Sequence, residues 1–205
     1  MDLYLFDLDK TLYAYDFRRR LPELARRTGV SQYGLASRWW AAGYERRAEA
    51  GEPATADAYL DMFAEVTGGR RLSLQEWGEV RAQAMTRMPA AVEAMRLAAS
   101  IGTVALLSNN PAATADALPL IAPDVAELVG ERALFSSRLG VRKPDPEIYR
   151  RALERLGADR AMLVDDSREN VLGAREAGLE AWQVVWVDGV PQLDGLPAAI
   201  EGFAR

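Results

Sequence analysis

Short apolar runs alternate along this chain with segments whose apolar residues recur at helical spacing. The runs predict strands at residues 3–6, 103–107, 133–135, 161–164 and 182–187. The helical spacing predicts helices at about 89–100, 146–156 and 168–177. The middle helix has clear ends, because Asp145 is a good N-cap, Pro146 suits the first helical position and Gly157 follows the last turn. This alternation predicts an α/β fold, a Rossmann-like parallel sheet covered by helices on both faces.

Residues 16–86 interrupt that alternation. Their apolar positions recur at helical spacing, and no convincing strand is found among them. Glycine-containing breaks at 29–31, 51–53 and 67–69 divide the segment into about four helices. We therefore expect an inserted all-helical cap domain at residues 16–86, with residues 1–15 and 87–205 forming the α/β core.

Two pairs of carboxylates follow predicted strands. Asp7 and Asp9 come after the first strand, one residue apart, so in an extended chain their side chains point the same way. Asp165 and Asp166 follow the strand at 161–164. Ligands of open parallel sheets bind beyond the carboxyl ends of strands, and paired carboxylates there need a divalent cation or a strong base between them. With the Thr11 hydroxyl on the first turn, the pattern predicts a site for a hard metal ion and a phosphate.

The composition excludes several chemistries. The 205 residues include no cysteine and no histidine, which removes disulfides, thiol nucleophiles, thiolate metal sites and mechanisms based on a Ser-His pair or a His-bound zinc. The net charge of −5 argues against a nucleic-acid partner. No apolar stretch is long enough to span a membrane, and no signal-peptide pattern is found at the start. We expect a cytoplasmic protein with one domain, or one domain and an insert.

Two further segments are candidates for phosphate binding. Ser108 and Asn109 precede Pro111, which is expected at the first helical position, so a hydroxyl and backbone N–H groups would face an anion there. Of the 25 basic residues only two are lysines, and one of them, Lys143, lies in the loop before a predicted helix. A retained lysine indicates a place for a compact ammonium, although chance retention is the alternative. Each motif taken alone is also typical of a helix cap or a turn.

Taken in order, four segments resemble the motifs of the haloacid dehalogenase-like (HAD) hydrolase superfamily. They are 7–11 (Asp-Leu-Asp-Lys-Thr), 108–110 (Ser-Asn-Asn), 143–144 (Lys-Pro) and 165–167 (Asp-Asp-Ser). The helical segment after the first motif is similar to the α-helical C1-type cap of that superfamily. The stretch 164–178 is similar to the branch that holds small-molecule phosphatases and dehalogenases.

The resemblance implies roles for these residues. Asp7 would attack phosphorus to form an aspartyl-phosphate, and Asp9 would protonate the leaving alcohol and then activate water. Mg²⁺ would be held by Asp7, the backbone carbonyl of Asp9 and Asp166, while Asp165 would be either a further ligand or a partner of Lys143. The residues expected to bind the phosphate are Thr11, Ser108, Asn109 and Lys143, of which Lys143 would also neutralise Asp7.

We therefore expect a Mg²⁺-dependent phosphatase of a small phosphorylated metabolite, with its oligomeric state left open. A 2-haloacid dehalogenase of the same fold is an alternative, but displacement of a halide needs neither a metal nor the acid Asp9. A phosphomutase remains open, as does a non-enzymatic receiver-like or degenerate phosphate-binding module, although receivers lack a 70-residue insert after the first strand. Substrate choice is expected in the cap, where the candidates are Trp39, Trp40, Tyr44 and Arg47.

Overall fold

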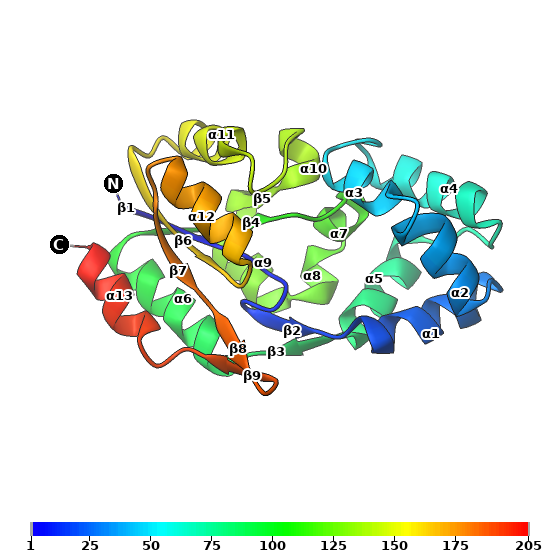
Figure 1. Ribbon diagram of the computed structural model, residues 1–205, viewed down its shortest axis with the longest axis horizontal. Helices are drawn as coiled ribbons and strands as arrows, with labels where there is room; N and C mark the ends of the chain where they lie inside the picture. The colour runs from blue at the N-terminus through cyan, green and yellow to red at the C-terminus, as the bar shows by residue number, and fades with distance from the viewer. Residues whose placement is uncertain (1, 205) are drawn as a thin grey trace.

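A five-stranded parallel sheet forms the centre of the molecule in the computed structural model, which describes residues 2–204. The strands lie in the order β5 (Ala133–Phe135), β4 (Thr103–Ser108), β1 (Asp2–Phe6), β6 (Arg160–Asp165) and β7 (Glu180–Gln183). In Figure 1 the sheet runs through the left half of the molecule. Because β1 pairs with both β4 and β6 in parallel, the carboxyl ends of these three strands meet at one edge.

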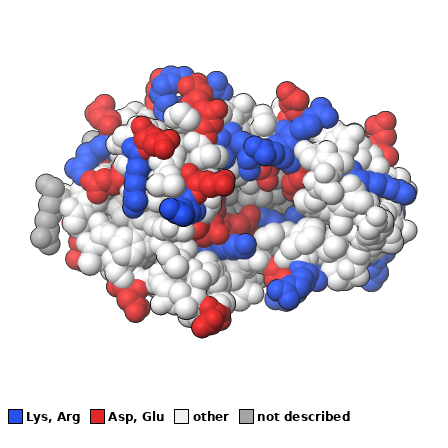
Figure 2. Space-filling view, in the orientation of Figure 1, with Lys and Arg blue, Asp and Glu red and all other residues white. Residues whose placement is uncertain are grey.

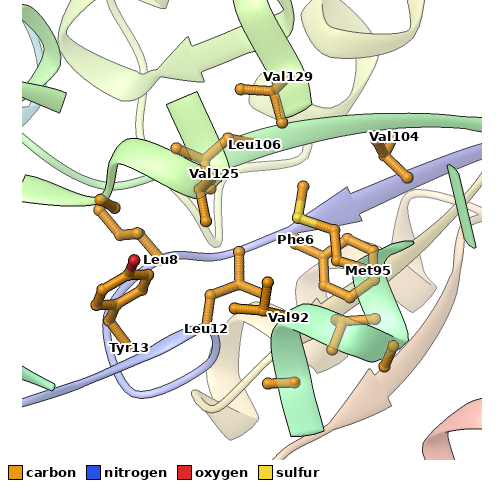
Figure 3. Packing of buried hydrophobic residues seen from close by; sticks show 14 of the residues in the cluster. Phe6, Leu8, Leu12, Tyr13, Val92, Met95, Val104, Leu106, Val125 and Val129 are labelled. Carbon is orange, nitrogen blue, oxygen red and sulfur yellow. The ribbon is translucent and has the colours of Figure 1, made fainter. Parts of the chain in front are cut away.

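Side chains of β1 alternate between two apolar layers, as the two-residue period of a strand requires. Tyr4 and Phe6 join the core on one face, under α6 (Pro89–Ile101), α8 (Leu118–Ile121), α9 (Pro123–Val129) and α13 (Leu196–Phe203). Figure 3 shows Phe6 beside Met95 in this layer. Leu3 and Leu5 join the core on the other face, under α10 (Ser136–Leu139), α11 (Pro146–Leu156) and α12 (Arg168–Glu176). The predicted α/β sheet with helices on both faces is thus confirmed.

Helices α1 to α5, between Phe17 and Gln83, are here called the helical block. They are α1 (Phe17–Thr28), α2 (Gln32–Leu35), the π-helical turn η1 (Ala36–Trp40), α3 (Tyr44–Glu49), α4 (Ala56–Thr67) and α5 (Leu74–Gln83). The block occupies the right half of Figure 1 and has its own apolar core, which includes Trp39, Phe63 and Trp77. Ala113 of α7 (Ala112–Asp116), a helix that follows β4, belongs to the same core.

The helical block is divided into more helices than the four that the sequence predicts. The second of them is broken at Gly43, whose φ of 82° ends the turn before α3. Trp39 and Trp40 therefore lie on η1, and Tyr44 and Arg47 lie on α3. The expected division of the chain at 15/16 and 86/87 into a core and a cap stays a prediction.

A two-stranded antiparallel ribbon connects the sheet with the helical block. It pairs β2 (Tyr13–Tyr15) with β3 (Met85–Arg87), where the chain enters and leaves the block. The expectation of no strand within 16–86 is wrong for its last two residues, which lie in β3. Three-residue strands have too few alternating positions to be read from a local pattern, and here the pairing partner is about seventy residues away in sequence.

The single strand expected at 182–187 is also wrong. β7 ends at Gln183, and β8 (Val185–Val187) turns back to pair with β9 (Val190–Gln192). Asp188 and Gly189 form the turn, both with positive φ (50° and 78°), as in the two-residue turns that Asp-Gly sequences favour. By contrast, α11 has the predicted ends: Asp145 accepts a hydrogen bond from the Glu147 backbone N–H, and Gly157 lies in the left-handed region.

No helix in the described part of the chain combines the length and the apolar character needed to cross a membrane.

Candidate active site

A buried lysine joins two carboxylates at the carboxyl edge of the sheet. Asp7 follows β1 and Asp165 ends β6, so the parallel pairing of these strands brings both side chains together. Nζ of Lys143 donates to Oδ1 of Asp7 at 2.9 Å, to Oδ2 of Asp165 at 2.5 Å and to the carbonyl of Leu107 at 2.7 Å. The Lys143 side chain is fully buried. All three donor positions of the ammonium are thus used inside the protein.

The backbone of Lys143 is held by Asn109. The Asn109 side chain donates Nδ2 to the carbonyl of Lys143 at 2.9 Å and accepts the backbone N–H of Lys143 at Oδ1, also at 2.9 Å. Among residues 2–204, the Asn109 side chain makes no other hydrogen bond. The side-chain amide of Asn109 therefore fixes the lysine loop. The expectation that the backbone around Ser108 and Asn109 binds phosphate stays a prediction.

Asp165 is saturated by hydrogen bonds. Oδ1 accepts the backbone N–H of Ser167 at 2.8 Å, and Asn170 Nδ2 lies 3.0 and 3.1 Å from Oδ1 and Oδ2. With Lys143 on Oδ2 as well, both oxygens are engaged. Of the two roles left open for Asp165, partner of the lysine is the one that this geometry favours.

Three carboxylates at this edge lie close enough together to hold a metal ion. One ligand oxygen from each of Asp7, Asp165 and Asp166 lies within 4.8 Å of the others. Burial raises the pKa of Asp7 to about 7, with Lys143 opposing the rise and the neighbouring carboxylates adding to it. Burial, followed by repulsion from Asp165, raises the pKa of Asp166 to about 6. Crowded, poorly hydrated carboxylate oxygens fit a hard divalent cation.

The charge on Lys143 persists despite its burial. Desolvation opposes the ammonium, but attraction from Asp165 and Asp7 raises the pKa of Lys143 above its usual range. The lysine therefore remains a fixed positive charge beside Asp7 at all pH values at which the protein would work.

Asp9 is contacted by two residues to which the sequence analysis gave no role. Its Oδ2 accepts from Nη2 of Arg81, on α5 of the helical block, and from Nδ2 of Asn110 at 3.2 Å. Its Oδ1 is buried and has no hydrogen-bond partner within the described chain. Arg81 lies 72 positions away in sequence, so no local pattern links it to Asp9. Asn110, next to the predicted Asn109, could have been found from the doublet of asparagines.

Ser108 and Thr11 are both buried near the strand ends. Oγ of Ser108 accepts from Nδ2 of Asn110 at 3.0 Å, so Asn110 links it to Asp9. The hydroxyl of Thr11 has no hydrogen-bond partner among residues 2–204. Pro111 is the N-cap of α7 and not its first helical residue as expected, because its ψ of 165° is extended.

The site opens into two cavities between the sheet and the helical block. A cavity of about 330 Å³ is lined by Asp9, Arg81 and Trp40, among others, and a larger one of about 760 Å³ reaches Asp166 and Tyr15. Figure 2 shows acidic atoms gathered near the middle of this face, where the surface is hollowed, with basic side chains around them.

Of the four candidates for substrate contact, only Trp40 lines either of these cavities. Trp39 is buried, stacks with Tyr44 at 5.5 Å and donates Nε1 to Glu45 at 2.6 Å. Arg47 lies over the ring of Tyr44 at 5.7 Å. Trp39 and Tyr44 therefore belong to the packing of the helical block, whereas Arg47 is exposed at its surface.

Part of this chain is similar in sequence to a known enzyme. A phosphoserine phosphatase of Thermus thermophilus is 43% identical over 58 residues, which is 27% of this chain and 22% of that protein. The chain therefore spans about a fifth of the length of this curated relative.

Solved structures match over nearly the whole chain. A HAD-like family hydrolase of Porphyromonas gingivalis has a TM-score of 0.74 at 16% identity, covering 100% of this chain and 98% of that one. A HAD family enzyme of Bacteroides thetaiotaomicron, an aspartate-to-alanine mutant in complex with magnesium and inorganic phosphate, has a TM-score of 0.69 at 20% identity, covering 89% and 93%. At these identities the likeness supports the fold.

The family itself follows from a sequence match that includes the ends of β1, β4 and β6, where the site lies. The haloacid dehalogenase-like hydrolase family matches residues 1–178, which contain both carboxylate pairs, the Ser108–Asn110 turn and Lys143. The chain belongs to the haloacid dehalogenase-like hydrolases.

Proposed function

We propose that this hydrolase is a Mg²⁺-dependent phosphatase that cleaves a small phosphate monoester through an aspartyl-phosphate. The observation that carries the proposal is the contact of Lys143 with both Asp7 and Asp165, with Asp166 beside them. A carboxylate nucleophile facing a dianionic phosphate needs fixed positive charge at the same place. Residues 16–86 would be the cap over the site, and residues 1–15 and 87–205 the catalytic core.

In the first step a carboxylate oxygen of Asp7 bonds to phosphorus, and the bond from phosphorus to the ester oxygen breaks. Asp9 gives its proton to that leaving oxygen. In the second step Asp9 takes a proton from water, the water oxygen bonds to phosphorus, and the bond to Asp7 breaks. Phosphate and the free carboxylate of Asp7 result. Ser108 and Thr11 would contact the phosphoryl oxygens, Lys143 would supply the positive charge beside Asp7, and Asn109 would act through the lysine loop that it holds.

Asp7 and Asp166 would hold Mg²⁺ together with the backbone carbonyl of Asp9, while Asp165 keeps Lys143 in place. The magnesium and inorganic phosphate bound in the Bacteroides thetaiotaomicron enzyme, and the phosphoserine phosphatase among the relatives, support this reading. When bound, the ion would offset the charge of the phosphoryl group.

The test is hydrolysis of an aryl phosphate and of a panel of metabolite phosphates, with and without Mg²⁺. We expect inorganic phosphate to be released only with the ion. Equal release in excess EDTA would contradict the metal assignment. Transfer of the phosphoryl group within a sugar without phosphate release would indicate a mutase, and release of chloride from a 2-chloroacid would indicate a dehalogenase.

Metal binding should also be visible in stability. Burial raises the pKa values of Asp7 and Asp166 to about 7 and about 6. At pH values between the ordinary carboxyl pKa and these raised values, the folded protein without metal therefore keeps protons that the unfolded chain has lost. That stabilising contribution is present at lower pH and is lost as the pH rises through these values. Mg²⁺ competes with the same protons, so it should raise the Tm much more near pH ~8 than near pH ~5.

Thermal unfolding with and without Mg²⁺ at the two pH values measures this effect. Asp166→Asn should lose most of the rise near pH ~8, whereas the exposed control Asp61→Asn should keep it. A rise in Tm that is the same at both pH values would place the bound ion elsewhere.

A further inference from the structure

Arg81 connects the helical block directly with Asp9. Its guanidinium Nη2 donates to Oδ2 of Asp9 and, at 3.3 Å, to Oδ1 of Asn110. Asn110 in turn donates Nδ2 to the same Asp9 oxygen at 3.2 Å. The three side chains form a closed triangle, and the Arg81 side chain is only 3% exposed. A buried guanidinium next to a carboxylate makes a strong, charge-assisted contact.

The guanidinium of Arg81 packs on an aromatic ring, and a second arginine binds the hydroxyl of that ring. Its Cζ lies 4.0 Å from the centre of the Tyr15 ring. Arg20 donates Nη1 to the hydroxyl of Tyr15 at 3.2 Å, and the Arg20 guanidinium lies 4.5 Å from the Trp77 ring. Stacking of guanidinium groups on ring faces is favourable and restricts their orientation. The position of Arg81 is therefore determined by Tyr15 of the connecting ribbon, which Arg20 of the helical block holds in turn.

The two oxygens of Asp9 consequently differ. Oδ2 receives two donors, whereas Oδ1 is buried without a partner in the described chain. A carboxylate fixed through one oxygen has one defined orientation, and its other oxygen has no hydrogen bond that proton transfer would have to break.

Resting on the function proposed above, we infer that Arg81 is a positioning residue: it fixes the orientation of Asp9 through Oδ2 and leaves Oδ1 to exchange a proton with the reacting ester oxygen and with water. The helical block would then take part in the chemistry as well as cover the site. Arg81 would act only through Asp9, without bonding to the substrate.

The test compares leaving groups. An alkyl phosphate needs a proton from Asp9 as its oxygen leaves, but an activated aryl phosphate does not. Arg81→Met should lower kcat/KM for the alkyl phosphate about 10²-fold and for the aryl phosphate by less than about threefold. Using kcat/KM restricts the comparison to steps up to phosphoryl transfer. Arg70→Gln, which removes an exposed ion pair with Glu76 on the same block, is the matched control and should change neither value.

A double-mutant cycle with Asp9→Asn tests whether Arg81 acts through Asp9. In the Asp9→Asn background, Arg81→Met should lower kcat/KM for the alkyl phosphate by less than about threefold more. Arg81→Lys keeps the charge without the planar contact, so its leaving-group effect should be intermediate. If circular dichroism shows that Arg81→Met does not fold, Arg81→Lys takes its place. It is then compared in the wild-type and in the Asp9→Asn background.

Three results would overturn the inference. Equal losses on the two substrates would indicate a structural role, a full additional loss in the Asp9→Asn background would show independence from Asp9, and a rise in KM alone would make Arg81 a substrate ligand. Failure of the wild type to hydrolyse either phosphate would instead contradict the proposed function.

Discussion

Asp7→Asn is expected to abolish phosphate release, with a loss of at least about 10³-fold in kcat. The amide has nearly the same shape as the carboxylate but is not a nucleophile toward phosphorus. Lys143 keeps its second carboxylate partner, Asp165, at 2.5 Å, so its charge stays compensated. The variant should therefore fold, and it should be no less stable than the wild type near pH ~8 without metal, because one of the crowded carboxylates is gone.

The measurement is steady-state release of phosphate from an aryl phosphate, paired with thermal unfolding. Asp57→Asn, an exposed carboxylate on the helical block, is the matched control and should be fully active. Mass spectrometry after rapid acid quench should detect a phosphoryl group on the wild type and none on Asp7→Asn. Substantial turnover by Asp7→Asn would rule out the covalent mechanism.

Lys143→Arg should be the second most damaging change although it keeps the charge. We expect kcat to fall about 10²-fold or more, because the fork of a guanidinium cannot contact Asp7, Asp165 and the Leu107 carbonyl as the compact ammonium does. The lysine is fully buried, so the larger side chain should also destabilise the fold by about 1–3 kcal/mol through overpacking.

Lys10→Arg is the natural comparison, since these are the two lysines of the chain. Lys10→Arg should remain close to the wild type in both kcat and the free energy of unfolding. Phosphate release and chemical denaturation measure the two effects for each variant. Near-normal kcat for Lys143→Arg would mean that the site needs a positive charge at this position but not the compact shape of an ammonium group.

The parts of the site that lie at strand ends could be predicted from the sequence. Asp7, Ser108 and Asp165 directly follow or end short apolar runs, and parallel pairing of β1 with β4 and β6 brings such residues to one edge. That geometry is fixed by the strand period and the fold class. The position of Lys143 before α11 was equally visible, because the N-cap and proline that begin the helix are local signals.

Contacts that depend on tertiary packing could not be read from the sequence. Arg81 looks like any polar residue of a helix, and only the docking of α5 near the strand ends brings it to Asp9. The side-chain amide of Asn109 had no predicted role, and only the approach of the Lys143 loop supplies it with both a donor and an acceptor. The hairpin at Asp188 and Gly189 is different: its turn signal was present in the sequence and was missed in favour of one long strand.

The shared core of the helical block and α7 has a consequence for recombining this protein with its relatives. Ala113 packs among residues of the block although it follows β4 in the chain. A chimaera made by exchanging only residues 16–86 would place a foreign apolar surface against a native α7. Complementary packing at close density tolerates such mismatches poorly. The unit that can be exchanged between hydrolases of this kind is therefore discontinuous, since it includes α7 and also α8, whose Leu120 lies against Gly78 of α5.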